Sequence, residues 1–295
     1  MGQGMPRFER ILIVPHVRKP AIGETVLKVG TWLEAHGASY FLLPDDVVAL
    51  GLDLPGVTLA DVEPPDLAVV LGGDGTMLRA VDILWDADVP LLGINIGKMG
   101  FLTAAEAHQA EQALSDVFDG KFRVSDRMPV GCTLEAGGSR RGFHALNEIV
   151  IGKLVQERLI HLSTYINGEF FMRYSGDGLI FASSTGSTAY SLSAGGPIVT
   201  PRANCLLLTP ICAHMLFSRP MVLDSGDRVK VSVEGDPERL SLSVDGRVDV
   251  EVPHGASIEF YGLGERVKIL EFTGTTFYGT VRRKFLSPPV CGDIQ

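Results

Sequence analysis

The sequence predicts an α/β domain with a parallel, Rossmann-like sheet, followed by an all-β domain of the sandwich type. Three observations lead to this fold class. In the first third of the chain, short aliphatic runs alternate with helical patterns. These runs are apolar throughout, as expected of parallel strands that are covered on both faces. Beyond about residue 122, short runs rich in Val, Ile, Tyr and Phe alternate with hairpin turns instead.

The first domain is expected to alternate strands and helices. The predicted strands are 10–14, 40–43, 66–71 and 90–94. Helical patterns cover residues 22–36 and 76–85. A third helix is expected to begin at a capping box, Thr103–Glu106, and to end at Gly120. Because parallel strands need a crossover connection, the alternation of strand and helix predicts parallel pairing.

Two dipeptides predict tight hairpin turns in the second domain, Asn167-Gly168 and Asp245-Gly246. Residues 229–233 and 240–244 alternate apolar and polar side chains, which is typical of half-buried strands. Several such short strands with turns between them predict a layered β structure.

The change of pattern also predicts the domain limits. The first domain is expected to span 1–103 and the second 104–273. Residues 274–295 form a tail, in which 277–285 is helix-like and basic and ends before two prolines.

Composition excludes several classes of function. The formal net charge is -9, with 26 Lys and Arg against 35 Asp and Glu, which argues against a nucleic-acid partner. No run approaches the 18 or so apolar residues of a membrane helix, and the N-terminus lacks the apolar core of a signal peptide. The four cysteines show no metal-ligand spacing. We therefore expect a cytoplasmic protein with no membrane partner.

A glycine-rich turn follows the third predicted strand. Gly72, Gly73 and Gly75 surround Asp74 directly before a helix. Backbone N–H groups and the dipole of such a helix favour phosphate, and missing Cβ atoms let it approach. A tight structural turn is the alternative, but Asp74 would repel phosphate unless it has a task. It could hold Mg²⁺ or accept a proton from an attacking hydroxyl.

Better-known nucleotide motifs do not fit. The stretch 93–99 is one residue short of a Walker A loop, and Met99 replaces its Ser or Thr. No GxGxxG follows a predicted strand, and no Ser lies in a GxSxG elbow. The sequence therefore excludes a P-loop and a classical dinucleotide-binding motif. It also excludes the commonest class of hydrolase, which uses the GxSxG elbow.

Two polar segments in the second domain are unexpected next to apolar strands. The run 175–197 is dense in hydroxyls and glycines and contains one aromatic ring that could stack on a base, Tyr190. It is either a plain loop or a polar pocket. Asn147 and Glu148 stand between apolar residues, and neighbouring strand side chains point to opposite faces. The pair is either an exposed strand end, or a strand end or bulge that brings both to a ligand.

Taken together, these segments resemble the NAD kinase family. The matching segments occur in family order between about residues 66 and 285: 72–76, 93–97, 100–102, 147–148, 176–178, 185–190, 194–197 and 218–220. The glycine turn alone also occurs in phosphofructokinases and lipid kinases. The combination with Asn147-Glu148 and the hydroxyl-rich run is specific.

The resemblance implies transfer of the γ-phosphoryl group of ATP to the 2′-hydroxyl of the adenosine ribose of NAD, giving NADP. It also implies an α/β domain, a β-sandwich domain and a tail that returns to the first domain. Mg²⁺ or another divalent metal would come with ATP, with no protein ligand assigned. Such chemistry needs positioning, a metal and one proton acceptor rather than a covalent nucleophile. The chain would form a homodimer or homotetramer. The sequence distinguishes neither NAD from NADH nor ATP from polyphosphate.

The resemblance also implies roles for single residues. Asp74 would be the catalytic base toward the 2′-hydroxyl, and the glycines around it would hold ATP phosphates. Glu148 would bond ribose hydroxyls, and Asp177 would face the nicotinamide end. The adenine site would be lined by Phe101, Asn147, Thr188, Ala189 and Tyr190. Further nucleotide-binding residues would be Thr76, Asn95, Thr185, Ser187 and Ser193.

The chain departs from the family pattern at Ser184 and Ala213, where proline is usual, and at Arg247, where glutamine is common. None of these changes removes a proposed catalytic group. Two rival functions remain at this point. A related kinase acting on lipid or sugar phosphate would leave Asn147-Glu148 without a task. A catalytically silent dinucleotide-binding protein would not keep an acid beside phosphates, because the charge weakens binding unless chemistry uses it.

Overall fold

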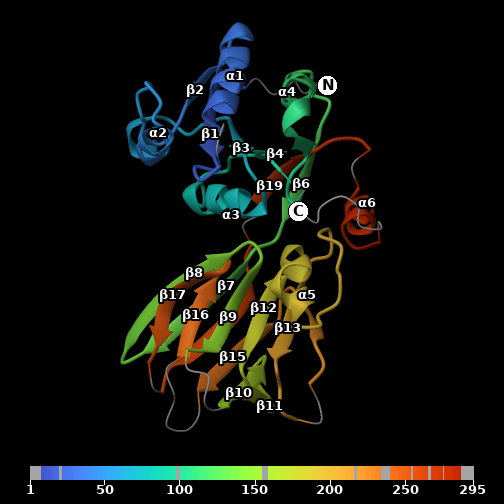
Figure 1. Ribbon diagram of the computed structural model, residues 1–295. Coiled ribbons are helices and arrows are strands. Elements are labelled where there is room, and N and C mark those ends of the chain that lie inside the picture. The colour runs from blue at the N-terminus through green and yellow to red at the C-terminus, as the bar shows by residue number, and fades with distance from the viewer. Residues whose placement is uncertain are drawn as a thin grey trace, which may run out of the picture. The chain divides into compact units, whose positions relative to one another are not determined.

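The computed structural model describes residues 8–19, 22–97, 100–154, 159–215, 218–233, 240–253, 255–264, 267–274 and 276–286. The chain divides into two compact units, 1–125 with 268–295, and 126–267 (Figure 1). The first unit extends beyond the expected limit at residue 103 because β6 (Arg123–Arg127) pairs within its sheet. The domain limits expected from the sequence, at residues 103 and 273, stay a prediction.

The first unit is an α/β fold, as predicted. Its sheet has the order β2-β1-β3-β4-β19-β6, with β5 beside β4. The strands are β1 (Arg10–Pro15), β2 (Ser39–Phe41), β3 (Leu67–Leu71), β4 (Leu91–Asn95), β5 (Ala105–Glu106) and β19 (Val267–Glu271). Strands β1 to β4 and β19 pair in parallel. Every residue of β3 and β4 is buried, which explains their continuous apolar sequence.

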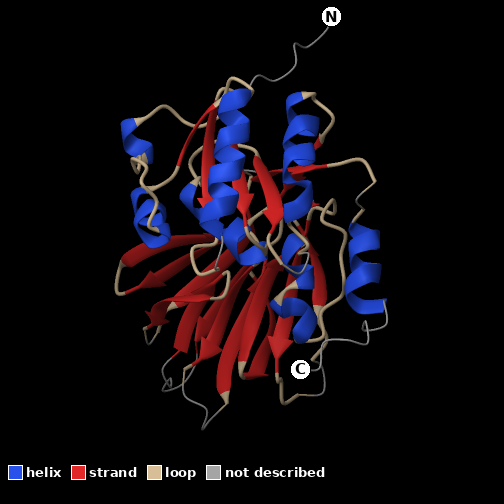
Figure 2. Ribbon diagram, turned by 45° about the horizontal axis from the view of Figure 1, so that its top comes forward, coloured by secondary structure: helices blue, strands red, loops and turns tan. Residues whose placement is uncertain are grey.

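Helices cover both faces of this sheet. They are α1 (Ile22–Ala35), α2 (Pro44–Leu50), α3 (Asp74–Ile83) and α4 (Ala110–Phe118), with short 3-10 turns at Leu59–Asp61 and Ala107–Gln109. Leu33 of α1 and Leu114 of α4 share one core with Leu92 and Ile94. A Cβ at Gly93 would lie 2.8 Å from Sδ of Met77, so α3 packs on the opposite face of β4. Figure 2 shows α1 and α4 side by side over the strands.

The predicted capping box at Thr103–Glu106 is wrong. Thr103 is buried, and Ala105–Glu106 forms β5, which pairs with the end of β4. The box lies three residues later, where the Glu106 side chain accepts from the N–H of Gln109 and the Gln109 side chain accepts from the N–H of Glu106. The helix therefore begins later than expected, because pairing with β4 takes up the first residues of the pattern.

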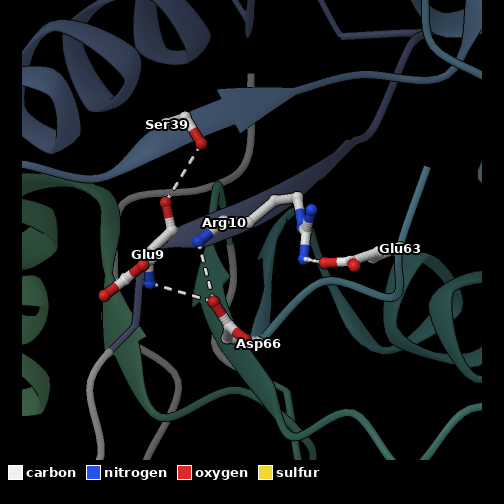
Figure 3. A network of polar contacts seen from close by, with 5 residues as sticks. All are labelled: Glu9, Arg10, Ser39, Glu63 and Asp66. Atoms are coloured by element: carbon white, nitrogen blue, oxygen red, sulfur yellow. Dashed lines mark hydrogen bonds and ion pairs between the residues drawn. The ribbon is translucent and has the colours of Figure 1, made fainter.

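Polar contacts tie β1, β2 and the start of β3 together at their amino ends (Figure 3). A carboxylate oxygen of Asp66 accepts from the N–H groups of Glu9, at 2.9 Å, and Arg10, at 2.8 Å. The Ser39 hydroxyl donates to the Glu9 carbonyl at 3.0 Å, and Arg10 pairs with Glu63. These contacts fix the register, so the loops after β1, β3 and β4 all leave from the opposite edge of the sheet.

The second unit is the predicted β-sandwich. It has two six-stranded antiparallel sheets, β11-β10-β15-β18-β7-β8 and β14-β13-β12-β9-β16-β17. The strands are β7 (Val130–Ala136), β8 (Ser139–Ala145), β9 (Glu148–Lys153), β10 (Ile160–Ile166), β11 (Glu169–Gly176), β12 (Gly178–Ser183), β13 (Cys205–Ile211), β14 (Met221–Asp224), β15 (Arg228–Val233), β16 (Leu240–Val244), β17 (Arg247–Val252) and β18 (Ser257–Gly262). Phe181 and Phe260, one from each sheet, stack 4.0 Å apart at the centre of its core.

Both predicted hairpins are confirmed. Asn167-Gly168 joins β10 to β11, and Asp245-Gly246 joins β16 to β17. All four residues have positive φ, between 45° and 85°, which Asn, Asp and Gly adopt at least cost. Two short helical turns, Thr185–Thr188 and α5 (Tyr190–Ser193), follow β12 in the hydroxyl-rich run.

The predicted C-terminal helix is present. It consists of α6 (Phe277–Val281) and a π-helical turn (Arg282–Leu286). The Phe101 ring lies 6.2 Å from that of Phe277 and 6.0 Å from that of Phe285, and Nζ of Lys284 lies 4.5 Å from its centroid. These contacts place the apolar side of the helix on the residue expected to line the adenine site. Across the described ranges, no helix has the length and apolar character to cross a bilayer.

Candidate active site

Asp74 is held in one orientation at the start of α3. It follows β3, which lies between β1 and β4 in the sheet. One carboxylate oxygen accepts from the N–H of Phe101 and the other from the N–H of Leu102, both at 2.9 Å. A Cβ at Gly100 would overlap the carboxylate, so this close approach requires glycine. Since each carboxylate oxygen has two lone pairs, Asp74 can still accept a further hydrogen bond.

The three glycines around Asp74 differ in what they leave room for. A Cβ at Gly72 would overlap the Thr76 side chain, so the fold itself requires that glycine. At Gly73 the nearest atom is Oδ1 of Asn95, 3.9 Å from an ideal Cβ. At Gly75, which is exposed, no heavy atom of the described residues lies within 4 Å. Packing within the chain therefore does not explain Gly73 and Gly75, whereas the approach of a ligand to the backbone does.

A cation that the sequence interpretation missed lies at the same edge of the sheet. Asn95, at the end of β4, is buried and donates from Nδ2 to the Gly97 carbonyl at 2.6 Å. Nζ of Lys19, in the loop after β1, lies 2.7 Å from the position of an ideal Cβ on Gly97. The available signal was a basic residue in the loop that follows the first predicted parallel strand.

The structure brings the Asn147-Glu148 pair and the hydroxyl-rich run together. Asn147 stands just before β9, and Glu148 is the first residue of that strand. The Ser183 N–H donates to the Asn147 carbonyl at 2.9 Å, and the Ser183 hydroxyl donates to the Leu146 carbonyl at 2.6 Å. A Cβ at Gly186 would overlap the Asn147 backbone. The pair therefore lies at a strand end, one of the arrangements that the sequence left open.

Glu148 is a buried acid in an unusual electrostatic setting. Burial, followed by repulsion from Asp245, raises the pKa of Glu148 to about 8, while a hydrogen bond from the Tyr190 N–H opposes this shift. Oε2 of Glu148 is buried without a hydrogen-bond partner in the part of the chain that the structure describes. An unsatisfied buried oxygen is costly, so a ligand hydroxyl would be a suitable partner. The Tyr190 side chain is 45 % exposed and free to take up a stacking ligand.

Among the other predicted nucleotide-binding residues, the Ser187 hydroxyl has partners inside the protein, whereas the Thr185 hydroxyl is buried without a hydrogen-bond partner among the described residues. Ser187 is fully buried, and its hydroxyl donates to the Val199 carbonyl at 3.0 Å and accepts from the Val199 N–H at 3.1 Å. Thr185 is buried, and its carbonyl accepts from the Thr188 hydroxyl at 3.4 Å. Ser193 is exposed at the end of α5, and Ala189 is half-buried just before it. We therefore assign Ser187 to the stability of this loop.

Asp177 has a partner that the sequence did not suggest. It lies in the connection from β11 to β12, and its Oδ1 is 2.6 Å from Nζ of Lys153 at the end of β9. Both side chains are largely buried, with 31 % and 16 % exposure. A half-buried ion pair of this kind has a fixed geometry and can present both charges to one polar ligand.

The described residues include no group of three or more His, Cys, Asp or Glu side chains arranged to hold a metal. Mg²⁺ commonly keeps several waters and is bound through substrate phosphates rather than by a cage of protein ligands. The residues present are therefore compatible with a magnesium ion that enters with a nucleotide.

Comparison with known proteins identifies the family. The model of the ATP-NAD kinase N-terminal domain matches residues 59–122, and that of the C-terminal domain matches residues 146–271. A protein named NAD kinase from Moorella thermoacetica is 36% identical over 94% of this chain and 89% of its own. One from Symbiobacterium thermophilum is 36% identical over 95% and 99%. The chain belongs to the NAD kinase family.

Solved structures of NAD kinases agree with this assignment. Yeast NADH kinase complexed with NADH has a TM-score of 0.86 and 25% identity, covering 96% of this chain and 89% of that one. An NAD kinase from Archaeoglobus fulgidus in complex with ATP has a TM-score of 0.73 and 25% identity, covering 92% and 98%. The chain is thus an enzyme of the kinase class. The resemblance and the two-domain fold class predicted from the sequence are both confirmed.

Proposed function

We propose that this protein transfers the γ-phosphoryl group of ATP to the 2′-hydroxyl of the adenosine ribose of NAD. The bond between the γ-phosphorus and the bridging oxygen breaks, a bond to the ribose oxygen forms, and Asp74 accepts the hydroxyl proton. The products are ADP and NADP. The observation that carries the proposal is the Asp74 carboxylate, fixed between two backbone N–H groups with accepting capacity left over.

Phosphate binding is assigned to the glycine turn. The open space at Gly75 lies at the first turn of α3, where N–H groups without helical partners and the helix dipole favour an anion. Gly73 and Asn95 border the same turn, and Thr76 fills the space beside Gly72. When bound, Mg²⁺ supplies neutralisation of phosphate charge. The protein's part is to position the phosphates and to remove the proton.

Binding of NAD is assigned to residues that the second unit brings together. The exposed Tyr190 ring offers a stacking surface for adenine, directly after Thr188 and Ala189 in the loop that packs on the Asn147 backbone at Gly186. Glu148 offers its unpaired carboxyl oxygen to ribose hydroxyls. Phe101, in the first unit, stays a predicted adenine contact on the family resemblance.

The remaining polar groups suggest how the far end of the dinucleotide is bound. The pair of Asp177 and Lys153 suits the polar nicotinamide end. Relatives of this fold have been solved with NADH and with ATP, which supports both substrate classes. We also propose a homodimer or homotetramer that acts in the cytoplasm.

A coupled assay tests the proposed reaction. Purified protein is incubated with Mg-ATP and either NAD or NADH, and an NADP-specific dehydrogenase then detects the product. We expect product from at least one acceptor and none when EDTA removes the metal. Failure of both acceptors in a folded sample would contradict the proposal.

Two glycine substitutions separate ligand binding from folding in the glycine turn. Gly75→Ala is expected to leave the melting temperature unchanged or slightly higher, because its Cβ points into open space and alanine favours helices. It is expected to raise the KM for ATP at least tenfold, because the methyl group occupies the space of a phosphate. Gly72→Ala is expected to destabilise the fold by about 1–3 kcal/mol through its overlap with Thr76. If Gly75→Ala left the KM for ATP unchanged, the proposal that a phosphate binds beside Gly75 would be wrong.

A further inference from the structure

A single carboxylate holds the backbone on which the Asn147-Glu148 pair stands. Asp245 lies in the turn between β16 and β17, at a φ of 45°. Its Oδ2 accepts from the N–H of Leu146 at 2.9 Å, and its Oδ1 accepts from the N–H of Asn147 at 2.8 Å and of Glu148 at 3.2 Å. The Asp245 N–H in turn donates to the Glu148 carbonyl at 3.0 Å.

These four bonds do more than close a hairpin. A tight turn needs only its own two strands, whereas Asp245 reaches a segment about a hundred residues earlier in the chain, where β9 begins. Three successive N–H groups pointing at one carboxylate fix the dihedral angles of the residues that carry them. The direction in which Asn147 and Glu148 leave the backbone is therefore set by the Asp245 side chain.

Asp245 also acts on Glu148 through its charge. It is the second cause, after burial, that raises the pKa of Glu148. Burial raises the pKa of Asp245 as well, while the three N–H bonds and Arg247 oppose that shift. The charged and polar groups facing Glu148 are thus Asp245 from the β16–β17 turn and the Tyr190 N–H from α5.

We propose that Asp245 is a positioning residue for the nucleotide acceptor: its carboxylate sets the backbone of Asn147 and Glu148 and lies as a charged neighbour beside Glu148. The inference rests on the proposed role of Asn147 and Glu148 in binding NAD. Asp245 itself need not touch the nucleotide.

Two variants separate the geometric from the electrostatic contribution. Asp245→Asn keeps the size and the tolerance of positive φ, and its carbonyl oxygen can keep the two bonds to Asn147 and Glu148. It loses the bond to Leu146 and the negative charge. Asp245→Gly keeps the backbone conformation at no steric cost but loses all three side-chain bonds.

The hairpin at Asn167 provides the matched control. Asn167 also has positive φ, at 51°, also precedes a glycine, and its side chain also bonds a neighbouring segment at Asp227 and at the Arg228 N–H. It lies in the other sheet of the sandwich. Asn167→Gly therefore reports the cost of removing a polar side chain from such a turn without affecting Asn147 and Glu148.

The experiment measures KM for NAD, KM for ATP, kcat and melting temperature for each variant, and the affinity for NAD as a function of pH. Asp245→Gly is expected to raise the KM for NAD about tenfold or more, the effect of losing bonds to a charged group, with KM for ATP within about twofold. In Asp245→Asn, the pH midpoint of NAD affinity is expected to move to lower pH, because Glu148 ionises more readily without the neighbouring charge. Asn167→Gly is expected to change neither the KM for NAD nor the pH midpoint of NAD affinity.

Glu148→Gln distinguishes a failure of the positioning role of Asp245 from a failure of the proposed NAD site. If Glu148→Gln weakens NAD binding while both Asp245 variants match Asn167→Gly, the positioning role is overturned and the proposed binding site survives. If Glu148→Gln leaves NAD binding unchanged, the proposed role of the pair itself fails. If Asp245→Gly does not fold, the pH midpoint of NAD affinity in Asp245→Asn still tests the positioning role. A purely structural contact would leave that midpoint unchanged.

Discussion

Replacing Asp74 by asparagine is expected to lower turnover by about 10² to 10⁴-fold, the usual cost of losing a general base, while NAD binding persists. An amide has nearly the shape of the carboxylate but does not accept a proton at neutral pH. Binding should survive because the proposed NAD contacts of the second unit do not involve Asp74.

The structure also predicts a smaller side effect of this substitution. Both oxygens of Asp74 accept backbone N–H groups, so the amide nitrogen of asparagine would face either Phe101 N–H or Leu102 N–H. Losing one such bond to a charged group costs about 1.5–3 kcal/mol, or roughly 10- to 150-fold if all of it fell on turnover. A loss above about 10³-fold, still within the range for a general base, therefore reports chemistry rather than displacement of the loop at 100–102.

Asp66→Asn is the matched control for this measurement. Asp66 also accepts two backbone N–H groups, from Glu9 and Arg10, but at the opposite edge of the same sheet. Because a single oxygen of Asp66 accepts both N–H groups, asparagine can keep both bonds, so this variant removes the charge with a smaller change in melting temperature and should leave turnover unchanged. Calorimetric titration of NAD beside the coupled assay completes the test. Turnover of Asp74→Asn within about threefold of the unmodified enzyme, well below the range for a general base, would refute the catalytic role. Lost NAD binding in a folded variant would make Asp74 a binding group instead.

Local patterns were sufficient for most of the fold. Strands such as β3 and β4 are buried on both faces, so their sequences are continuous apolar runs that need no partner to be recognised. Hairpins at Asn167 and Asp245 were predictable because positive φ strongly selects the residue type. The capping box at Thr103 failed because β5 pairs with β4, and such pairing depends on a segment outside the local pattern.

The sequence grouped the proposed site residues only where they stand close together in the chain. Asp74 and its glycines form one segment, whereas its partners Phe101 and Leu102 are brought to it by the fold. Lys19 and Lys153 belong to no recognisable motif. Only the fold shows that they lie beside Gly97 and Asp177.

A motif can also contain residues that hold the fold. Ser187 belongs to the hydroxyl-rich run that matches the family, yet its hydroxyl is used twice by the Val199 backbone. A sequence motif does not separate a hydroxyl that binds a ligand from one that holds its own loop, because both give the same pattern. Burial and hydrogen-bond partners distinguish the two.

Gly186→Ala is expected to combine a loss of stability with a loss of NAD affinity. Its Cβ would overlap the carbonyl oxygen of Asn147 and lie 2.5 Å from the carbonyl carbon and 2.8 Å from Cα. A backbone neighbour cannot move aside as a flexible side chain can, and this one is held by Ser183 on one side and Asp245 on the other. Overpacking of this kind costs about 1–3 kcal/mol or more.

The methyl group of Gly186→Ala is expected to displace the Asn147 backbone in one direction, away from residue 186. Pushing Asn147 away from Gly186 also moves Glu148, so the affinity for NAD should fall more than the affinity for ATP. Gly142→Ala, in β8 of the same unit, is the control, because no heavy atom of the described residues lies within 4 Å of its ideal Cβ. Thermal unfolding and titrations of both nucleotides on the two variants provide the comparison. Equal melting temperatures for the two variants would show that the backbone around Asn147 yields at little cost, and Gly186 would then have no part in shaping the acceptor site.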